Sequence, residues 1–267
     1  MKIRLLYVLA LIVCLSGCLD KETEEEDAKD VCQLLSSTTT IKNHQGASFN
    51  YSLTYSYDDQ GNLIQIAAPD TSMLNIKLEY DAQNRLIRER SGSYSWTSEY
   101  NTTGQVTKQT RTFAFALDRY ETFYLLHAYD SENNIIESEY YAAESGGDVL
   151  LYTYRYTYSD GKVNGIEMLS EQDARHYTAT LVTDAKKAQL PALPMHMLYM
   201  FRDETIPAIG LLNGNVTNYN VQHGEGESGF KTFAADITYN ASGYPTAVTR
   251  NYASGATENT TYSYSCK

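Results

Sequence analysis

A short phrase that begins with tyrosine recurs along this chain of 267 residues. Each copy continues with Asp, Asn or Ser, reaches a Gly or Asn within a few positions, and in most copies closes with an aliphatic residue. Asp and Asn side chains cap tight turns, and Gly and Asn adopt the positive φ that such turns need. The copies begin at Tyr57, Tyr80, Tyr100, Tyr129, Tyr158 and Tyr239. The phrase therefore predicts a series of β-hairpins, each with a tyrosine at the end of one strand.

The residues before the phrase alternate between apolar and polar side chains. Before the first turn, Tyr51, Leu53, Tyr55 and Tyr57 alternate with Ser52, Thr54 and Ser56. A period of two is typical of strands with one buried and one solvated face. We therefore predict an all-β fold: a long antiparallel meander of roughly twelve to sixteen strands, curled into a barrel-like or half-open sheet, with tyrosine rings inward.

The tyrosine phrase resembles the YD repeat of RHS-type proteins. It resembles more closely the hairpins of a family of Bacteroidota lipoproteins of unknown function with a porin-like β fold. The resemblance covers roughly residues 49–265. The chain departs from the large RHS proteins, because it has few copies, uneven spacing and no separate toxin-like tail. The resemblance implies the hairpin architecture, and the family supplies no activity to transfer.

The phrase is absent between residues 184 and 229, where Pro191, Pro194 and Pro207 lie. Proline lacks a backbone donor and is therefore excluded from central strands. We predict that 184–229 is an irregular excursion from the sheet, with one short helical piece near 196–202. Its apolar residues indicate a plug or lid over an open end of the sheet, and a lid that gates a ligand is the alternative.

The first residues have the pattern of a secretory signal. Lys2 and Arg4 precede an apolar run that is too short to span a bilayer, and this run ends in the lipobox Leu-Ser-Gly-Cys at 15–18. We predict a signal peptide over 1–17 and lipidation of Cys18, as in the bacterial lipoproteins that this segment resembles. Several acyl chains on that cysteine anchor a protein firmly. The predicted location is the outer membrane, on either the cell surface or the periplasmic side.

The mature chain is predicted to consist of an acidic tether over 18–31 and a β domain over 32–267. The tether is rich in charge and has no apolar periodicity, which indicates an extended linker. In the β domain the cysteines are Cys32 and Cys266. A disulfide between them is one interpretation, because disulfides persist outside the cytoplasm. Two unpaired thiols are the other, because spacing alone does not establish contact.

The charge of the chain limits its partners. The full chain has a net charge of -12, and loss of the two basic residues Lys2 and Arg4 with the signal brings the mature chain to -14. An acidic surface repels phosphate backbones and anionic lipid headgroups. We therefore expect no nucleic-acid partner, and we expect membrane contact only through the N-terminal lipid.

No constellation in the sequence indicates a catalytic, metal or cofactor site. The five histidines are scattered without ligand spacing, and no cysteine pair suits zinc. A nucleophile elbow, a phosphate loop and a dinucleotide fingerprint are all absent from the sequence. We therefore predict no catalytic residue, no metal and no cofactor, and we predict that the protein is not an enzyme.

Tyr94 and Trp96, the single tryptophan of the chain, are the candidates for ligand stacking. On an outward face they would form a platform for a sugar ring. The alternative is that both share the inward face with Tyr100, since all three are even positions, and this parity favours the inward placement.

These features together predict a membrane-anchored envelope lipoprotein with a non-catalytic binding or scaffold role and a glycan or an envelope protein as partner. The alternatives are an enzyme of the secreted compartment that acts on glycan, and a purely structural envelope component. An aromatic-lined concavity favours binding, and a filled interior favours the structural role. Converging carboxylates, or a histidine with a hydroxyl in a cleft, would favour an enzyme.

Overall fold

The alternating segments form strands in the computed structural model, which describes residues 31–69, 75–116, 119–172, 176–188, 214–223 and 232–266. Within these ranges there are sixteen strands in chain order. Their bounds are β1 Cys32–Lys42, β2 Ser48–Tyr57, β3 Leu63–Ala67, β4 Asn75–Tyr80, β5 Leu86–Ser91, β6 Tyr94–Tyr100, β7 Val106–Ala116, β8 Arg119–Tyr129, β9 Ile135–Ala143, β10 Val149–Ser159, β11 Lys162–Ser170, β12 His176–Thr183, β13 Val216–His223, β14 Phe233–Tyr239, β15 Pro245–Tyr252 and β16 Thr257–Cys266. The predicted signal peptide 1–17, Cys18 and all of the tether except Val31 lie outside the described residues.

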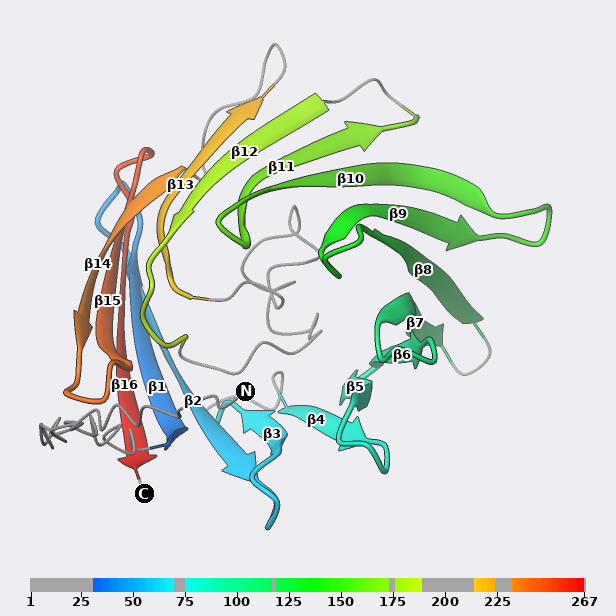
Figure 1. Ribbon diagram of the computed structural model, residues 1–267. Coiled ribbons are helices and arrows are strands. Elements are labelled where there is room, and N and C mark those ends of the chain that lie inside the picture. Colours follow the sequence, from blue (N-terminus) through cyan, green and yellow to red (C-terminus); the bar gives the residue numbers. More distant parts are fainter. Residues whose placement is uncertain are drawn as a thin grey trace, which may run out of the picture. The chain divides into compact units, whose positions relative to one another are not determined.

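The strands form one antiparallel meander that closes on itself. Each strand pairs with the next along the chain, and β1 pairs with β16, so the sheet is a closed barrel. In Figure 1 the strands follow one another around a ring, with β1 beside β16. The predicted all-β meander is confirmed, and of the two predicted shapes the closed barrel is the one adopted. Closure leaves no free sheet edge in this ring.

In five of the six copies the hairpin turn is closed by the Asp or Asn that follows the tyrosine. In the first turn, Asp58 Oδ1 accepts hydrogen bonds from the backbone N–H groups of Gln60 and Asn62, at 2.9 and 2.8 Å. The turn also contains a residue with positive φ. In the first turn this residue is Gly61, with a φ of 87°, and in the following copy it is Asn84, with a φ of 58°. The phrase thus supplies both a carboxylate clamp and a left-handed residue, as predicted.

Four of the six tyrosines of the phrase also tie their hairpin to the preceding one. The hydroxyl of each donates to the backbone carbonyl of the aliphatic residue that closes the previous phrase. Four such bonds, each 2.8 Å long, join Tyr80 to Leu63, Tyr100 to Leu86, Tyr129 to Val106 and Tyr158 to Ile135. Burial raises the pKa of Tyr129 to about 12, so this hydroxyl keeps its proton at neutral pH. Each bond contributes about 1 kcal/mol, and we call the series the tyrosine ladder.

A seventh turn of the same kind lies in the segment predicted to be irregular. The Asp184 carboxylate accepts hydrogen bonds from the backbone N–H groups of Lys186 and Asn215, each 3.1 Å long. Gly214 has a φ of 107°, and a Cβ on it would lie 2.6 Å from the Asp184 carbonyl oxygen. Only glycine fits there. Gly214 and Asn215 therefore complete a phrase that Asp184 begins, and residues 187–213 are an insertion in its turn.

The predicted excursion is accordingly too long. The strand β13, Val216–His223, lies within the predicted range 184–229 and pairs with both β12 and β14. The Tyr239 hydroxyl donates to Asp184 Oδ2, so the tyrosine of the next copy reaches back to this turn as well. The short helical piece predicted near 196–202 lies outside the described residues.

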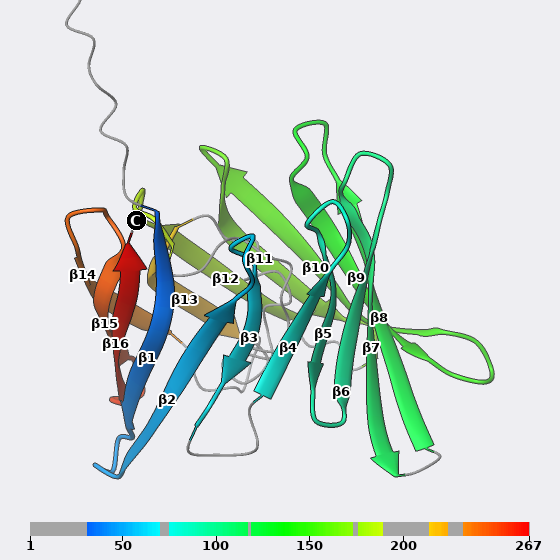
Figure 2. The same ribbon diagram turned by 90° about the horizontal axis from the view of Figure 1, so that it is seen from below.

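Successive connections of a meander lie at alternate ends of the sheet. The seven turns follow β2, β4, β6, β8, β10, β12 and β14, so they are every second connection and all lie at the same end of the barrel. The first residue of β1, Cys32, and the last residue of β16, Cys266, also lie at this end, which we call the turn end. Figure 2 shows the end of β16 at the top of the view, level with the hairpin between β2 and β3.

The seam between β1 and β16 is closed by covalent and polar contacts. Cys32 and Cys266 are register partners and are joined by a disulfide across a sequence separation of 234. Further along the seam, the buried hydroxyls of Thr39 and Thr260 are hydrogen bonded at 2.9 Å. The disulfide joins the two ends of the β domain at β1 and β16, the pair of barrel strands that are remote in sequence.

Candidate functional site

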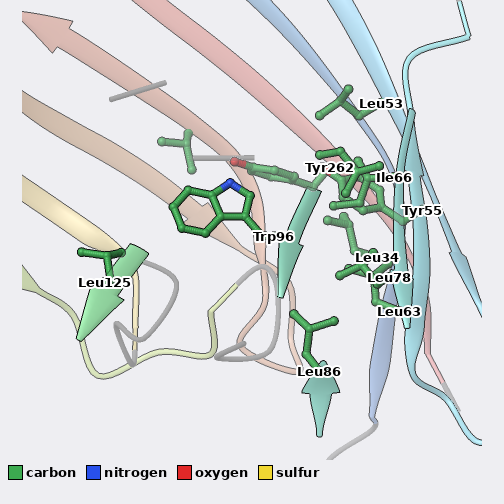
Figure 3. Packing of buried hydrophobic residues seen from close by; sticks show 12 residues of the cluster. Leu34, Leu53, Tyr55, Leu63, Ile66, Leu78, Leu86, Trp96, Leu125 and Tyr262 are labelled. Carbon is green, nitrogen blue, oxygen red and sulfur yellow. The ribbon is translucent and has the colours of Figure 1, made fainter. Parts of the chain in front are cut away.

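The buried face of the strands is the inner face of the barrel. Leu34 of β1, Leu125 of β8 and Val248 of β15 belong to one buried cluster, which only the concave face of a closed sheet allows. In Figure 3 the aliphatic side chains Leu53, Leu63 and others of β1 to β3 gather together, and Trp96 and Leu125 lie apart from them. A second cluster gathers on β9 to β13.

The outer face of the described strands is largely polar, with Leu126, Ile136 and Val182 as exposed apolar exceptions. In β10, Tyr154 and Tyr156 are buried and Arg155 between them is exposed; in β4, Leu78 is buried and Lys77 is exposed. Barrels that contact lipid carry an apolar band on the outside. In these two strands, the outward residues Lys77 and Arg155 are charged instead. None of the described residues forms a helix with the length and hydropathy needed to cross a membrane.

An aromatic surface covers part of the inner face on β6 to β9. The rings of Tyr94 and Phe113 are stacked with centroids 4.3 Å apart, and those of Phe123 and Tyr140 with centroids 5.6 Å apart. All four side chains are only half-buried, unlike the aliphatic residues on the same face, which are almost completely buried. We call these four residues the aromatic wall.

Arg111 lies in the middle of the aromatic wall. Its register partners are Trp96 on β6 and Phe123 on β8, so the three residues form one cross-strand row. The guanidinium carbon is 5.1 Å from the centre of the Tyr94 ring and 5.7 Å from that of Phe123. Arg111 Nη1 donates to the Tyr140 hydroxyl at 3.5 Å. These contacts place a cation against aromatic faces, which attract it electrostatically.

Tyr94 and Trp96, the residues predicted for ligand stacking, both face the interior. Trp96 is 5% exposed and belongs to the buried core, so it offers no face to an external ligand. Tyr94 is half-buried and stacks on Phe113. The structure thus gives the two residues different surroundings, with Tyr94 in the aromatic wall and Trp96 in the packed layer next to it.

A buried polar chain lies beside the aromatic wall. His127 Nε2 is 2.9 Å from Gln109 Oε1, and His127 Nδ1 is 2.7 Å from Ser138 Oγ. Gln109 Nε2 in turn donates to Ser98 Oγ at 3.2 Å. Burial lowers the pKa of His127 to about 4, so its ring is neutral at pH 7 and can donate from one nitrogen while it accepts at the other.

A histidine beside a serine hydroxyl is the arrangement that would favour an enzyme. Here Ser138 is 0% exposed, so no substrate can reach its oxygen in this conformation. The group that contacts the other nitrogen of His127 is the Gln109 amide, which cannot stabilise an imidazolium as a carboxylate does. The chain of polar groups instead satisfies hydrogen bonds inside the barrel.

A second charged group faces inward near the seam. Arg250 of β15 forms an ion pair with Glu258 of β16, its register partner, and both side chains are largely buried. The Tyr252 hydroxyl donates to Glu258 Oε2 at 3.0 Å, and the Arg250 guanidinium lies 5.5 Å from the centre of the Phe233 ring. This arginine is therefore neutralised by a carboxylate of the barrel itself.

The described residues contain no group of three or more His, Cys, Asp or Glu side chains that could hold a metal ion. Of the histidines, His127 is buried in the polar chain, and His176 on the outer face lies 2.9 Å from Glu167. His196 lies outside the described residues.

Sequence reasoning did not single out Arg111, His127 or the Arg250–Glu258 pair as partners in the interior. The signal was available for Arg111, because it follows Gln109 and precedes Phe113 on the inward parity of β7. A charged residue at an inward position of a strand is the informative exception to the pattern. The partner of each residue depends on register, which the phrase does not give.

Solved structures of similar fold include two porin-like proteins of Bacteroides. A porin-like protein from Bacteroides uniformis ATCC 8492 aligns over 87% of this chain and 96% of its own, with a TM-score of 0.53 and 15% identity. A porin-like protein from Bacteroides vulgatus ATCC 8482 aligns over 87% of this chain and 99% of its own, with a TM-score of 0.53 and 9% identity. At such identities the likeness concerns the fold alone.

Comparison of the sequence itself gives no relative. No protein-family model matches it, and no curated protein is similar to it. The resemblance of the tyrosine phrase to the YD repeat therefore depends on the residues quoted above. What the comparisons establish is architecture: the chain has the β-barrel fold of Bacteroides porin-like proteins.

Proposed function

We propose that this chain is a lipid-anchored envelope protein with a non-catalytic binding role, and that the aromatic wall holds the ligand. The observation that carries the proposal is the exposure of this wall. Its four rings are left half-buried on a face where Leu34, Leu53 and Leu63 are each 1% exposed. Rigid aromatic surfaces with a few polar groups are the common lining of ligand sites.

The envelope location is supported by three features. The lipobox at 15–18 predicts an anchor at Cys18, the disulfide between Cys32 and Cys266 suits an oxidising compartment, and the solved structures of similar fold are porin-like proteins. Because the outer face of the barrel is largely polar, the lipid rather than the barrel wall would make the contact with the membrane. The ligand class is a glycan or a segment of an envelope protein.

Binding is tested with the mature protein made lipid-free by Cys18→Ala, on a glycan array and in pull-downs from envelope extracts. We expect Phe123→Ala combined with Tyr140→Ala to abolish the binding that the parent shows. The matched control is Tyr124→Ala on the outer face, where Tyr124 stacks on Tyr141. Binding that survives loss of the wall but not of Tyr124 would contradict the proposal, and a parent that retains no ligand would favour a purely structural role.

The anchor is tested separately. Inhibition of lipoprotein signal peptidase by globomycin should leave the precursor uncleaved, and Cys18→Ala should release the protein from the membrane fraction. A Cys18→Ala protein that stays in the membrane fraction would overturn lipid anchoring and leave the binding proposal untouched.

A further inference from the structure

Arg111 and Arg250 both point into the barrel, but among the described residues only Arg250 has an anionic partner. Arg250 pairs with Glu258. Among the described residues no carboxylate forms an ion pair with Arg111, and its Nε is buried without a hydrogen-bond partner. Its polar contact is the long bond to the Tyr140 hydroxyl, at 3.5 Å.

A guanidinium in these surroundings is prepared for an anion. It presents a planar set of donors that matches a carboxylate in a bidentate pair. The rings of Tyr94 and Phe123 hold it at the wall, and cation–π contacts compensate only part of its lost hydration. An anionic group on a ligand would supply the rest.

The surroundings also limit the charge of that ligand. One guanidinium carries one positive charge, and its register partners Trp96 and Phe123 are neutral. A monoanion such as a carboxylate is favoured over a phosphate dianion. The stacked pair of Phe123 and Tyr140 provides a flat surface for the remainder of the ligand.

We propose that Arg111 is the specificity-determining residue of the aromatic wall, and that the ligand is a ring compound bearing one carboxylate. The carboxylate would pair with the Arg111 guanidinium, and the ring would lie against Phe123 and Tyr140. This inference rests on the proposed binding function and adds the class of ligand to it. A sugar acid and an aryl acid share this chemistry, so the experiment must separate them.

The barrel contains its own reporter for the experiment. Trp96 is the single tryptophan of the chain, is 5% exposed, and is the direct register partner of Arg111. The mature protein in detergent is titrated with glucuronate and with benzoate, and with glucose and benzyl alcohol as their neutral counterparts. Trp96 fluorescence and isothermal calorimetry both measure the dissociation constants.

We expect one of the two acids to bind at least tenfold more tightly than its neutral counterpart. If that acid is glucuronate, the ligand is a sugar acid, and if it is benzoate, the ligand is an aryl acid. Arg111→Met, which keeps an unbranched stem but removes the charge, should abolish that preference. Arg111→Lys should recover only part of it, because an ammonium is a point charge. Arg88→Met on the outer face is the matched control and should bind as the parent does.

The outcomes separate this inference from the function beneath it. Acids and neutral counterparts that bind equally in the parent would overturn the role of Arg111 and leave the binding function standing. A preference for acids that persists in Arg111→Met would do the same. If none of the four probes binds in calorimetry, the assignment of a ring acid as ligand is overturned, and the glycan array and the pull-downs decide the binding function separately. Far-UV circular dichroism and the melting temperature of each variant establish that a loss of preference is not a loss of fold.

Discussion

Two parts of the inner face treat a buried arginine in different ways. Near the seam, Arg250 is neutralised by Glu258, and the Tyr252 hydroxyl completes the group. On β7, Arg111 lies against the Tyr94 and Phe123 rings without such a carboxylate among the described residues. The first arrangement satisfies its charge within the fold. The second leaves a charge without a carboxylate among the described residues, which is why we assign Arg250 a structural role and propose a binding role for Arg111.

The surroundings extend this contrast. The seam side contains the disulfide and the Thr39–Thr260 bond in addition to the ion pair. The β7 side contains the half-buried aromatic wall and the neutral chain of Gln109, His127 and Ser138. We infer that stability is concentrated at the seam and that binding is concentrated on the opposite wall. The predictions below test this division, from the largest expected effect to the smallest.

Loss of the disulfide should have the largest effect. Closing a loop between Cys32 and Cys266, which are 234 residues apart, stabilises the fold by at most about 5 kcal/mol through loop-closure entropy. The double variant Cys32→Ser, Cys266→Ser should therefore unfold at a much lower urea concentration than the parent. Addition of a reductant should lower the urea midpoint of the parent and leave that of the variant unchanged. Coincident urea unfolding curves for the parent and the variant would contradict the inference that stability is concentrated at the seam.

Acid should weaken the β7 side through His127. Its folded pKa of about 4 lies below the ordinary value of 6.5, because burial disfavours the charged ring. Between these two pH values the unfolded chain binds more protons, so stability falls as the pH falls, by about 3 kcal/mol over the whole window. His127→Gln should flatten that part of the curve of unfolding free energy against pH. The control His176→Gln, on the exposed outer face, should leave the slope as in the parent.

Removal of the carboxylate near the seam should be costly. Glu258→Gln leaves Arg250 largely buried without a counter-charge, which should lower the unfolding free energy by about 2 to 3 kcal/mol. Glu79→Gln is the matched control, because Glu79 pairs with Arg88 and Arg90 on the outer face with a third or more of each side chain exposed. Exposed pairs contribute less than about 1 kcal/mol. Equal effects of the two changes on urea midpoints would show that the Arg250–Glu258 pair contributes no more to stability than the exposed pairs of Glu79.

Removal of the Arg111 cation should have the smallest effect. Arg111→Met deletes a charge that has no anionic partner among the described residues and keeps the apolar stem, so we expect a change within about 1 kcal/mol in either direction. Arg250→Met should be worse, because it leaves the Glu258 carboxylate without its partner. Thermal unfolding of the two variants side by side measures the difference. If Arg111→Met is the more destabilising of the two, Arg111 is a structural residue.

The sequence predicted the architecture because the tyrosine phrase states each hairpin locally. Asp58 and Gly61 lie next to the residues that they constrain, and the alternation from Tyr51 to Tyr57 assigns the inner face. The sequence did not reveal the seventh turn, because Asp184 and Asn215 are separated by the insertion, and the clamp between them is visible only in space. Likewise, the row of Trp96, Arg111 and Phe123 depends on the registers of two strand pairs. Local signals determine which residues face inward, and register determines which of them meet.

The clamp at Asp184 has a practical consequence for protein engineering. Because a side chain and one glycine close this turn, the strands on either side keep their pairing although 27 residues separate Lys186 from Gly214. An Asp or Asn clamp also closes five other turns on this rim. That rim offers several equivalent ports at which a foreign peptide could be grafted for display, each flanked by an Asp or Asn on entry and a left-handed residue on return.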